Sequence, residues 1–255
     1  MRFEINDKKK CDIFIHIFNN LKNFTDNAII HIDNDKMFIQ GMDNSHVCVY
    51  ELQLDNSWFS QWTVEESQEY GICLPIFNKI LHTWSDKQNI TIYSENPDKL
   101  EIEFTSDTKG DFDKFFQFPL MDIDSELLCI PETDYECDIT MESHKVKHIV
   151  DELACFNDTI NLKCDEEKLC IDATSSEGSM KVVINMDDIE SLAVVEDKTV
   201  EATFSIRYLA YMCQFHKLSE NCTIHMSENI PIQLKYEINE VCFMKLYLAP
   251  KMNDE

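Results

Sequence analysis

The chain contains few glycines and none of the glycine-rich loops that bind nucleotide phosphates. Only 4 of its 255 residues are glycine, and neither G-x-x-x-x-G-K-[ST] nor G-x-G-x-x-G occurs. An apolar run of about 20 residues is also lacking, and no apolar segment follows the charged N-terminus MRFEINDKKKC. We therefore expect a soluble, intracellular protein that has no membrane partner and whose activity does not depend on nucleotide chemistry.

The cysteines form no C-x-x-C pair, and basic residues are scarce. The 11 cysteines are odd in number and widely scattered, a pattern typical of reduced, mostly buried thiols and not of disulfides or a zinc site. There are 22 Lys and Arg residues against 48 Asp and Glu, a formal net charge of −26. Nucleic-acid binding therefore requires that the basic residues cluster on one face.

The order of predicted elements is repeated along the chain, which is long enough for two modest domains. Apolar residues at helical spacing predict helices over 11–24, from about Pro75 to Trp84, from about Ser143, and near 205. The first and third helices, and the second and fourth, are separated by about 130 residues, which indicates a duplicated domain. The predicted fold is α+β, with β-rich domains at 1–118 and 136–255 that contain two helices each and are joined by a connector at 119–135.

Alternating or continuous apolar runs predict the strands. In the first half they are MRFEI (1–5), AIIHI (28–32), KMFIQGM (36–42), VCVYELQL (47–54), EYGICL (69–74), NITIYS (89–94), KLEIEFT (99–105) and FDKFFQF (112–118). In the second half they are YECDITM (135–141), TINLKC (159–164), KLCIDAT (168–174), SMKVVINM (179–186), VEATFSI (200–206), TIHM (223–226), PIQLKYEI (231–238) and VCFMKLYLAP (241–250). The repeat places MFIQGMDNS of the first half over KLCIDATSS of the second.

The connector PLMDIDSELLCIPETDY has neither a helical nor an alternating period. It contains five acids, and apolar residues interrupt them at irregular intervals, unlike a flexible Gly/Ser linker. Two interpretations remain open: these apolar side chains pack on the domain beneath them, or they form a hydrophobic surface for partners.

Basic residues outnumber acids in the predicted helices. We count six basic residues, Lys22, Lys79, Lys145, Lys147, Arg207 and Lys217, against the acids Asp12, Asp151 and Glu152. Such sorting is expected if the helices turn one face toward a polyanion. The alternative is an ordinary solvated helix surface, which would carry acids in proportion.

Five motifs resemble the proliferating cell nuclear antigen family, the eukaryotic and viral DNA sliding clamps. They are MDNSHV (42–47), LMDID (120–124), IPETDY (130–135), SIRYL (205–209) and YLAPK (247–251). The resemblance covers essentially the whole chain and implies a homotrimeric ring of six domains around duplex DNA. It also implies a non-catalytic processivity factor for DNA polymerase and a docking platform for replication and repair proteins, without cofactor or metal.

The resemblance implies which residues contact DNA. The family's basic positions match Lys22, Lys79 and Arg207, whereas His82, His148, Asp151 and Gln214 replace residues that are commonly Lys or Arg. The positive charge that lines the hole of the ring is therefore expected to be lower than is usual in the family. Lys145, Lys147 and Lys217 lie near the usual positions and could compensate. Contacts would be to phosphates and independent of sequence, as a sliding ring requires.

The resemblance further implies a pocket for short peptides of the form Q-x-x-aliphatic-x-x-aromatic-aromatic. Such peptides belong to polymerases, flap nucleases and ligases; a clamp loader is also an expected partner. The matching residues are Met42, His46, Val47, Leu128, Ile130, Pro131, Tyr135, Pro231, Tyr247, Ala249, Pro250 and Met252. An apolar floor with Met and Pro suits an aromatic side chain, and surrounding acids select the charge of the peptide.

Subunits of the family join through edge strands, for which FDKFFQF and SMKVVIN are the candidates. The interface residues expected here are Phe112, Phe115, Phe116, Met180, Val182 and Val183. Glu166 stands where the family has its ubiquitin-accepting lysine, so that this modification would need Lys163 or Lys168 instead.

Other functions leave weaker signals. His144 and His148 are four residues apart on a predicted helix, but no H-E-x-x-H motif or further ligand accompanies them. The segment Asp33–Asp35 resembles part of a calcium loop but fits a hairpin turn better, and no local motif marks a nucleophile.

The second hypothesis is a clamp paralogue with a different assembly, such as a checkpoint-clamp subunit or a viral processivity or transcription factor. Localisation would be nuclear for a cellular protein, and the host nucleus or a cytoplasmic replication factory for a viral one.

Overall fold

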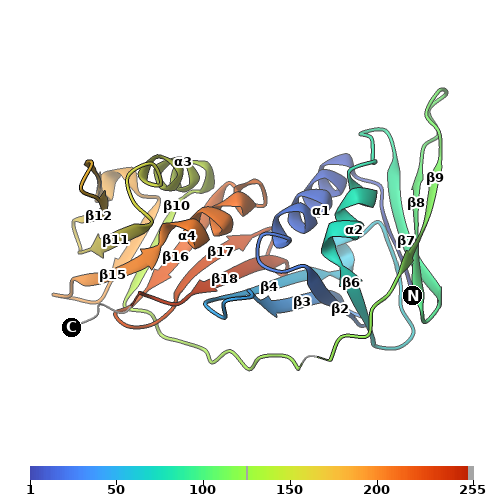
Figure 1. Cartoon of the computed structure of the whole chain (residues 1–255), viewed down its shortest axis with the longest axis horizontal. Helices are drawn as coiled ribbons and strands as arrows, with labels where there is room; N and C mark the ends of the chain where they lie inside the picture. The colour runs from blue at the N-terminus through green and yellow to red at the C-terminus, as the bar shows by residue number, and fades with distance from the viewer. Residues whose placement is uncertain (125, 252–255) are drawn as a thin grey trace. The chain divides into compact units, whose positions relative to one another are not determined.

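The computed structural model describes residues 1–124 and 126–251, which fall into two compact units. Unit 1 consists of Met1–Asn44, Glu51–Leu128 and Asn239–Phe243, and unit 2 consists of Ser45–Tyr50, Cys129–Ile238 and the chain from Met244 onward. Figure 1 shows the elements along the chain. Among the residues described, no helix is both long and apolar enough to cross a membrane.

Unit 1 combines two helices with two sets of antiparallel strands. The helices are α1 (Lys8–Leu21) and α2 (Leu74–Leu81). One sheet has the order β5 (Gln61–Thr63), β1 (Arg2–Ile5), β7 (Asn89–Asn96), β8 (Lys99–Thr105) and β9 (Lys114–Pro119). The other strands lie in the order β4 (Cys48–Asp55), β3 (Lys36–Met42), β2 (Asn27–Ile32) and β6 (Gln68–Cys73), and the 3₁₀ turn η1 spans Asn56–Trp58. Only the part of β4 from Glu51 onward belongs to unit 1.

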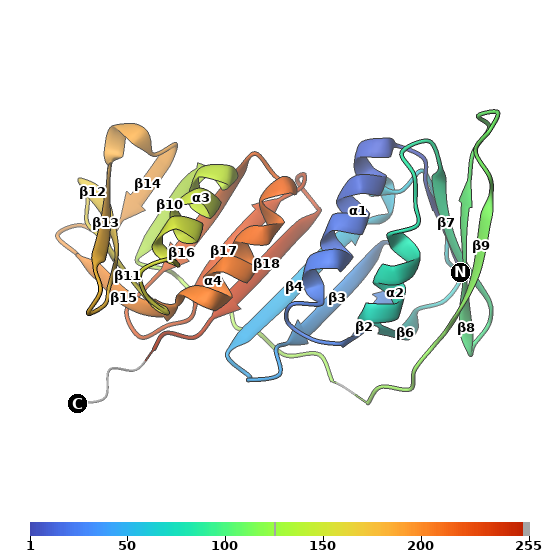
Figure 2. The ribbon, with the colours of Figure 1, turned by 45° about the horizontal axis from the view of Figure 1, so that its top comes forward.

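Unit 2 repeats this plan with α3 (Ser143–Leu153) and α4 (Ile206–Cys213). One sheet has the order β13 (Ser179–Asn185), β12 (Lys168–Thr174), β11 (Thr159–Cys164) and β15 (Val200–Ser205). The remaining strands follow the order β14 (Ser191–Val194), β10 (Cys137–Glu142), β16 (Asn221–Met226), β17 (Ile232–Glu237) and β18 (Phe243–Leu248), with 3₁₀ turns η2 (Met186–Asp188) and η3 (Gln214–Lys217). Figure 2 shows α3 and α4 side by side over this second set of strands.

Hydrogen bonds at the turns confirm the duplication. In the β2–β3 hairpin, Asp33 Oδ1 accepts from the backbone N–H groups of Asp35 and Lys36 at 2.8 and 2.9 Å. In the β11–β12 hairpin, Asp165 Oδ1 accepts in the same way from Glu167 and Lys168 at 2.9 and 3.0 Å. The two halves therefore share the side-chain bonds that close this turn as well as the order of their elements.

The repeat is offset by one residue from the predicted superposition. β3 and β12 are both seven residues long, and Lys36 of β3 corresponds to Lys168 of β12 because both close the hairpin described above. The predicted alignment placed Met37 over Lys168, which is wrong by one position. In a strand, an error of one residue exchanges the two faces, so the hairpin is the better guide to equivalent positions.

The first helix begins earlier than predicted. It starts at Lys8 because Asp7 caps it, with Asp7 Oδ1 accepting from the N–H of Lys10 at 3.0 Å, and it ends at Leu21 before Phe24. This bond is also the main reason that the pKa of Asp7 is lowered. The second helix ends at Leu81, before Trp84. The short strands β5 and β14 were missed, since three or four residues are too few to show a period.

Most predicted core positions are buried. Of the apolar stripe predicted for the first helix, Ile17, Leu21 and Phe24 are buried, whereas Ile13 is half-buried. Eight of the 11 cysteines are buried as well, which fits thiols that pack as small hydrophobes. Burial raises the pKa of the Cys11 thiol to about 11, so this side chain stays neutral at physiological pH.

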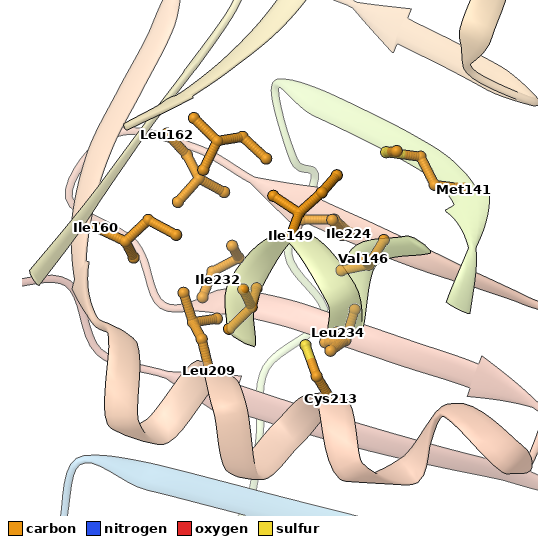
Figure 3. A pocket seen from close by; sticks show the side chains of 12 residues that line it. Met141, Val146, Ile149, Ile160, Leu162, Leu209, Cys213, Ile224, Ile232 and Leu234 are labelled. Carbon is orange, nitrogen blue, oxygen red and sulfur yellow. The ribbon is translucent and has the colours of Figure 1, made fainter. Parts of the chain in front are cut away.

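The core of unit 2 contains an apolar cavity of about 30 Å³. Figure 3 shows the side chains around it, which come from α3, α4 and strands of both sets in unit 2. The lining residues are Met141, Val146, Ile149, Val150, Ile160, Leu162, Ile171, Leu209, Cys213, Ile224, Ile232 and Leu234. Because its walls offer hardly any hydrogen-bond partners, such a cavity favours an apolar group over water.

Filling this cavity should stabilise the protein. We expect Val146→Ile to raise the free energy of unfolding by about 0.5–1 kcal/mol, because one added methylene occupies space that is now empty. Urea denaturation followed by circular dichroism measures the change. The matched variant Val195→Ile, at an exposed position of unit 2, should stay within about 0.5 kcal/mol of wild type. A loss of stability in Val146→Ile alone would show that the cavity does not accept the larger side chain.

Candidate nucleic-acid and peptide-binding surfaces

In unit 1, the predicted DNA-binding residues lie at the C-terminal ends of the two helices. Lys22 directly follows α1, Lys79 is in the last turn of α2, and His82 directly follows α2. Asn19 Oδ1 accepts a bond from Lys22 Nζ at 2.9 Å and lies 3.1 Å from His82 Nε2, so one amide links residues of both helices. In the described part of the chain, no carboxylate forms an ion pair with Lys22 or Lys79, whose positive charges also suit a helix C-terminus.

Three predicted DNA-binding residues on α3 have carboxylate partners nearby. Lys145 Nζ is 2.5 Å from Glu142, and the Nδ1 of His148 is 3.5 Å from Glu152. Lys147 forms an ion pair with Asp151, one turn along the helix. The hydrogen bond from Lys145 lowers the pKa of Glu142 and raises that of Lys145. These exposed pairs are weak, but they reduce the positive potential of α3.

On α4, Tyr211 contacts the basic side chain of Arg207. The Arg207 guanidinium lies 5.5 Å from the ring centre of Tyr211, and its Nε donates to Tyr211 Oη at 3.1 Å. Lys217, the last residue of η3, is exposed. Nearby, burial lowers the pKa of His216, which therefore adds little charge near neutral pH.

Each unit ends one of its sheets in a strand with an exposed apolar side chain. β9 is the outer strand in unit 1, and its Phe115 is 67% exposed. β13 is the outer strand in unit 2, and its Val183 is 51% exposed. The other predicted interface residues differ: Phe112 lies in the loop before β9 and is exposed, whereas Phe116, Met180 and Val182 are half-buried. Two uncovered edges can pair with further strands.

In unit 1, Met42 ends β3 and Leu128 lies in the connector, where its side chain is 38% exposed. The neighbouring Leu127 is 53% exposed, so the connector does present apolar side chains to solvent. Two residues that the sequence did not indicate, Gln40 and Gly71, contact the connector directly. The only signal for Gly71 is that glycine is rare in this chain and here interrupts a strand.

In unit 2, two contacts bring predicted peptide-binding residues together. The N–H of Ala249 donates to the carbonyl of Val47 at 2.9 Å. Tyr135 Oη donates to the carbonyl of Pro231 at 3.3 Å, and the Tyr135 ring lies 5.4 Å from that of His225. Burial is the main reason that the pKa of Tyr135 is raised.

The other predicted peptide-binding residues differ in their exposure to solvent. His46 is exposed and has a positive φ of 58°. Ile130, Tyr247 and Pro250 are half-buried, Pro131 is exposed, and Met252 lies outside the described residues.

The imidazoles of His144 and His148 lie near Glu142 and Glu152, and the described residues include no group of three or more side chains that could hold a metal ion. Asp33 closes a hairpin, as expected.

Glu166, at which the resemblance predicted the loss of a modified lysine, makes a hydrogen bond. The carboxylate of Glu166 accepts a bond from the N–H of Asp197 at 2.9 Å. Of the two alternative lysines, Lys163 forms an ion pair with Glu201 at 2.9 Å, which raises the pKa of Lys163, and Lys168 is half-buried.

Comparisons with known proteins cover both halves of the chain. Residues 3–127 match the family model "Proliferating cell nuclear antigen, N-terminal domain", and residues 129–251 match "Proliferating cell nuclear antigen, C-terminal domain". The proliferating cell nuclear antigen of Chaetomium thermophilum is 26% identical over 253 residues, which is 97% of each chain. A crystal structure of the PCNA2–PCNA3 complex from Sulfolobus tokodaii has the same fold, with a TM-score of 0.88 at 20% identity over 98% of this chain and 99% of that chain.

Proposed function

Because the chain belongs to the proliferating cell nuclear antigen family of non-catalytic DNA sliding clamps, we propose that it forms a homotrimeric ring around duplex DNA. The observation that carries this assembly is the pair of outer strands β9 and β13 with the exposed side chains of Phe115 and Val183. Head-to-tail pairing of β9 from one subunit with β13 from the next would cover both edges, and three copies would close the ring.

A heteromeric ring is the second candidate. The related crystal structure from Sulfolobus tokodaii contains a complex of two different clamp proteins. The carboxylate partners of Lys145, Lys147 and His148 weaken the positive charge expected of a ring that binds DNA alone. Whether the purified chain forms a ring in the absence of any other protein distinguishes a homomeric from a heteromeric assembly.

We propose that the ring contacts DNA mainly through Lys22, Lys79, Arg207 and Lys217, with smaller contributions from the paired Lys145 and Lys147 and from His82 and His148. Contacts with phosphates would be independent of sequence and would weaken as the salt concentration rises. Topology would hold the ring on DNA, so modest affinity is compatible with processivity.

Reversing two of these charges should weaken DNA binding without breaking the ring. We expect Lys79→Glu with Arg207→Glu to reduce affinity for duplex DNA at low salt about tenfold or more, and to reduce the slope of log K against log [salt] by about 2. Fluorescence anisotropy across a salt series measures both. Lys163→Glu with Lys235→Glu makes the same change in charge on strands β11 and β17 and should have little effect. Equal losses in the two double variants would remove the assignment of the contact surface.

We further propose that the connector and the chain around Val47, Tyr135 and Ala249 bind short peptides of polymerase, clamp loader, flap nuclease and ligase. The exposed side chain of Leu128 in the connector would supply apolar contact area for an aliphatic or aromatic anchor. The acids of the connector would favour basic residues flanking that anchor. In a eukaryotic cell the clamp would work in the nucleus, and for a virus in the host nucleus or a cytoplasmic replication factory.

A further inference from the structure

The first half of the connector is fastened to unit 1 by backbone pairing. Beyond the end of β9, the N–H of Leu120 donates to the carbonyl of Asp98 at 2.9 Å, and the N–H of Met121 donates to the carbonyl of Gly71 at 2.8 Å. Met121, which lies outside the named strands, thereby forms an isolated antiparallel bridge with Gly71 of β6. At this point the backbone no longer pairs with β8 and pairs with β6 instead. The start of the connector therefore has a fixed position on unit 1.

Gly71 is the residue that permits this bridge. A Cβ atom at position 71 would lie 2.2 Å from the carbonyl oxygen of Met121 and 3.0 Å from side-chain carbons of Ile123. Any side chain would force the connector backbone away from β6, because the closest atom is backbone and cannot rotate aside. Glycine is required here by the close approach of a second chain segment.

A glutamine side chain fastens the connector a second time, at Leu128. Gln40 Oε1 accepts from the N–H of Leu128 at 2.6 Å, and Gln40 Nε2 donates to the carbonyl of Leu128 at 3.0 Å. Gln40 Nε2 also donates to Glu51 Oε1 at 2.9 Å, which orients the amide. The amide therefore pairs with both backbone groups of one residue, as a neighbouring strand would.

We propose that Gln40 is a positioning residue for peptide binding, and this rests on the proposed peptide-binding function. Gln40 binds both the N–H and the C=O group of Leu128, so that the exposed side chain of Leu128 keeps one orientation. Gly71 fixes the other end of the same connector segment. A peptide then meets an ordered leucine instead of having to order the connector, and the conformational entropy lost on binding is smaller.

The first test combines hydrogen exchange with a peptide titration. In Gln40→Ala, we expect the Leu128 amide to exchange at least about tenfold faster, and a Q-x-x-aliphatic-x-x-aromatic-aromatic peptide to bind about tenfold more weakly. The matched control is Gln53→Ala, since Gln53 Nε2 also donates to a backbone carbonyl, that of Val241 at 3.0 Å. Unchanged exchange at Leu128 in Gln40→Ala would overturn the proposal.

A double-mutant cycle separates positioning from general destabilisation. If Gln40 acts through Leu128, Gln40→Ala should weaken peptide binding about tenfold in wild type but less than about twofold in a Leu128→Ala background. Additive losses would overturn the proposal.

A second pair of variants tests the other attachment. Gly71→Ala should speed exchange of the Met121 amide and weaken binding of the peptide. Gly178→Ala should do neither, because a Cβ atom at position 178 would have Phe156 Cδ1 as its nearest neighbour, at an ordinary contact distance of 3.7 Å. Equal behaviour of the two glycine variants would count against the role of Gly71. If the wild-type protein binds no such peptide, the peptide-binding function fails and so does the role of Gln40 in it. Fast exchange at Leu128 in Gln40→Ala would then still show that Gln40 holds the connector.

Discussion

Replacing Leu128 and Ile130 together by alanine is expected to weaken peptide binding about 100-fold or more. Both residues belong to the connector, and Leu128 is 38% exposed in the free chain. Removing two large apolar side chains from a binding surface removes about 1.5–3 kcal/mol each, and each 1.4 kcal/mol is a factor of ten in affinity. Isothermal titration with the peptide used above measures the loss.

The control for this variant is Leu127→Ala. Leu127 is next to Leu128 and more exposed, at 53%, but it is not among the residues that match the family's pocket. We expect its replacement to change the affinity less than about threefold. An unchanged affinity in the Leu128 and Ile130 double variant would remove the pocket assignment.

Placing a carboxylate on either outer strand is expected to convert the ring into monomers. Phe115→Asp in β9 or Val183→Asp in β13 would put an unpaired charge into an apolar junction, which costs several kcal/mol. Because every subunit contributes one copy of each edge, a single substitution affects all junctions of a head-to-tail ring. Light scattering should report about 30 kDa in place of about 90 kDa, while Val241→Asp, at an exposed valine of unit 1, should not change the mass.

Mixing the two edge variants distinguishes head-to-tail pairing from other assemblies. A Phe115→Asp chain retains an intact β13, and a Val183→Asp chain retains an intact β9. One intact junction can therefore form between them, and the mixture should contain a dimer of about 60 kDa that cannot close into a ring. Failure of the mixture to form any dimer would argue against pairing of β9 with β13.

Local patterns were sufficient to predict much of the fold. The predicted bounds of β3, β8, β11 and β12 agree with the structure residue for residue, because each is an alternating or apolar sequence between clear turn signals. The start of α1 was missed because Lys8–Lys10 carry no apolar period, and the cap at Asp7 is a single side-chain bond. The Glu142 partner of Lys145 lies just before α3, so a count of charges within helices did not include it.

The residues that hold the connector could not be predicted from local patterns. Gln40 and Leu128 are 88 positions apart, and Gly71 meets Met121 through an isolated bridge. Neither contact follows from strand alternation or helical spacing, since both depend on where the connector crosses unit 1. Sequence patterns identified the connector's apolar residues, whereas the exposure of those residues and the connector's attachment points required the structure.

The most direct test of the proposed ring is the solution mass of the purified wild-type chain. Light scattering at micromolar concentration and mass photometry at nanomolar concentration should both give about 90 kDa, three chains of 29.9 kDa each. A trimer that persists on dilution is the predicted result. A monomer of about 30 kDa at every concentration would contradict the homotrimeric ring and would indicate a clamp subunit that requires a different partner chain.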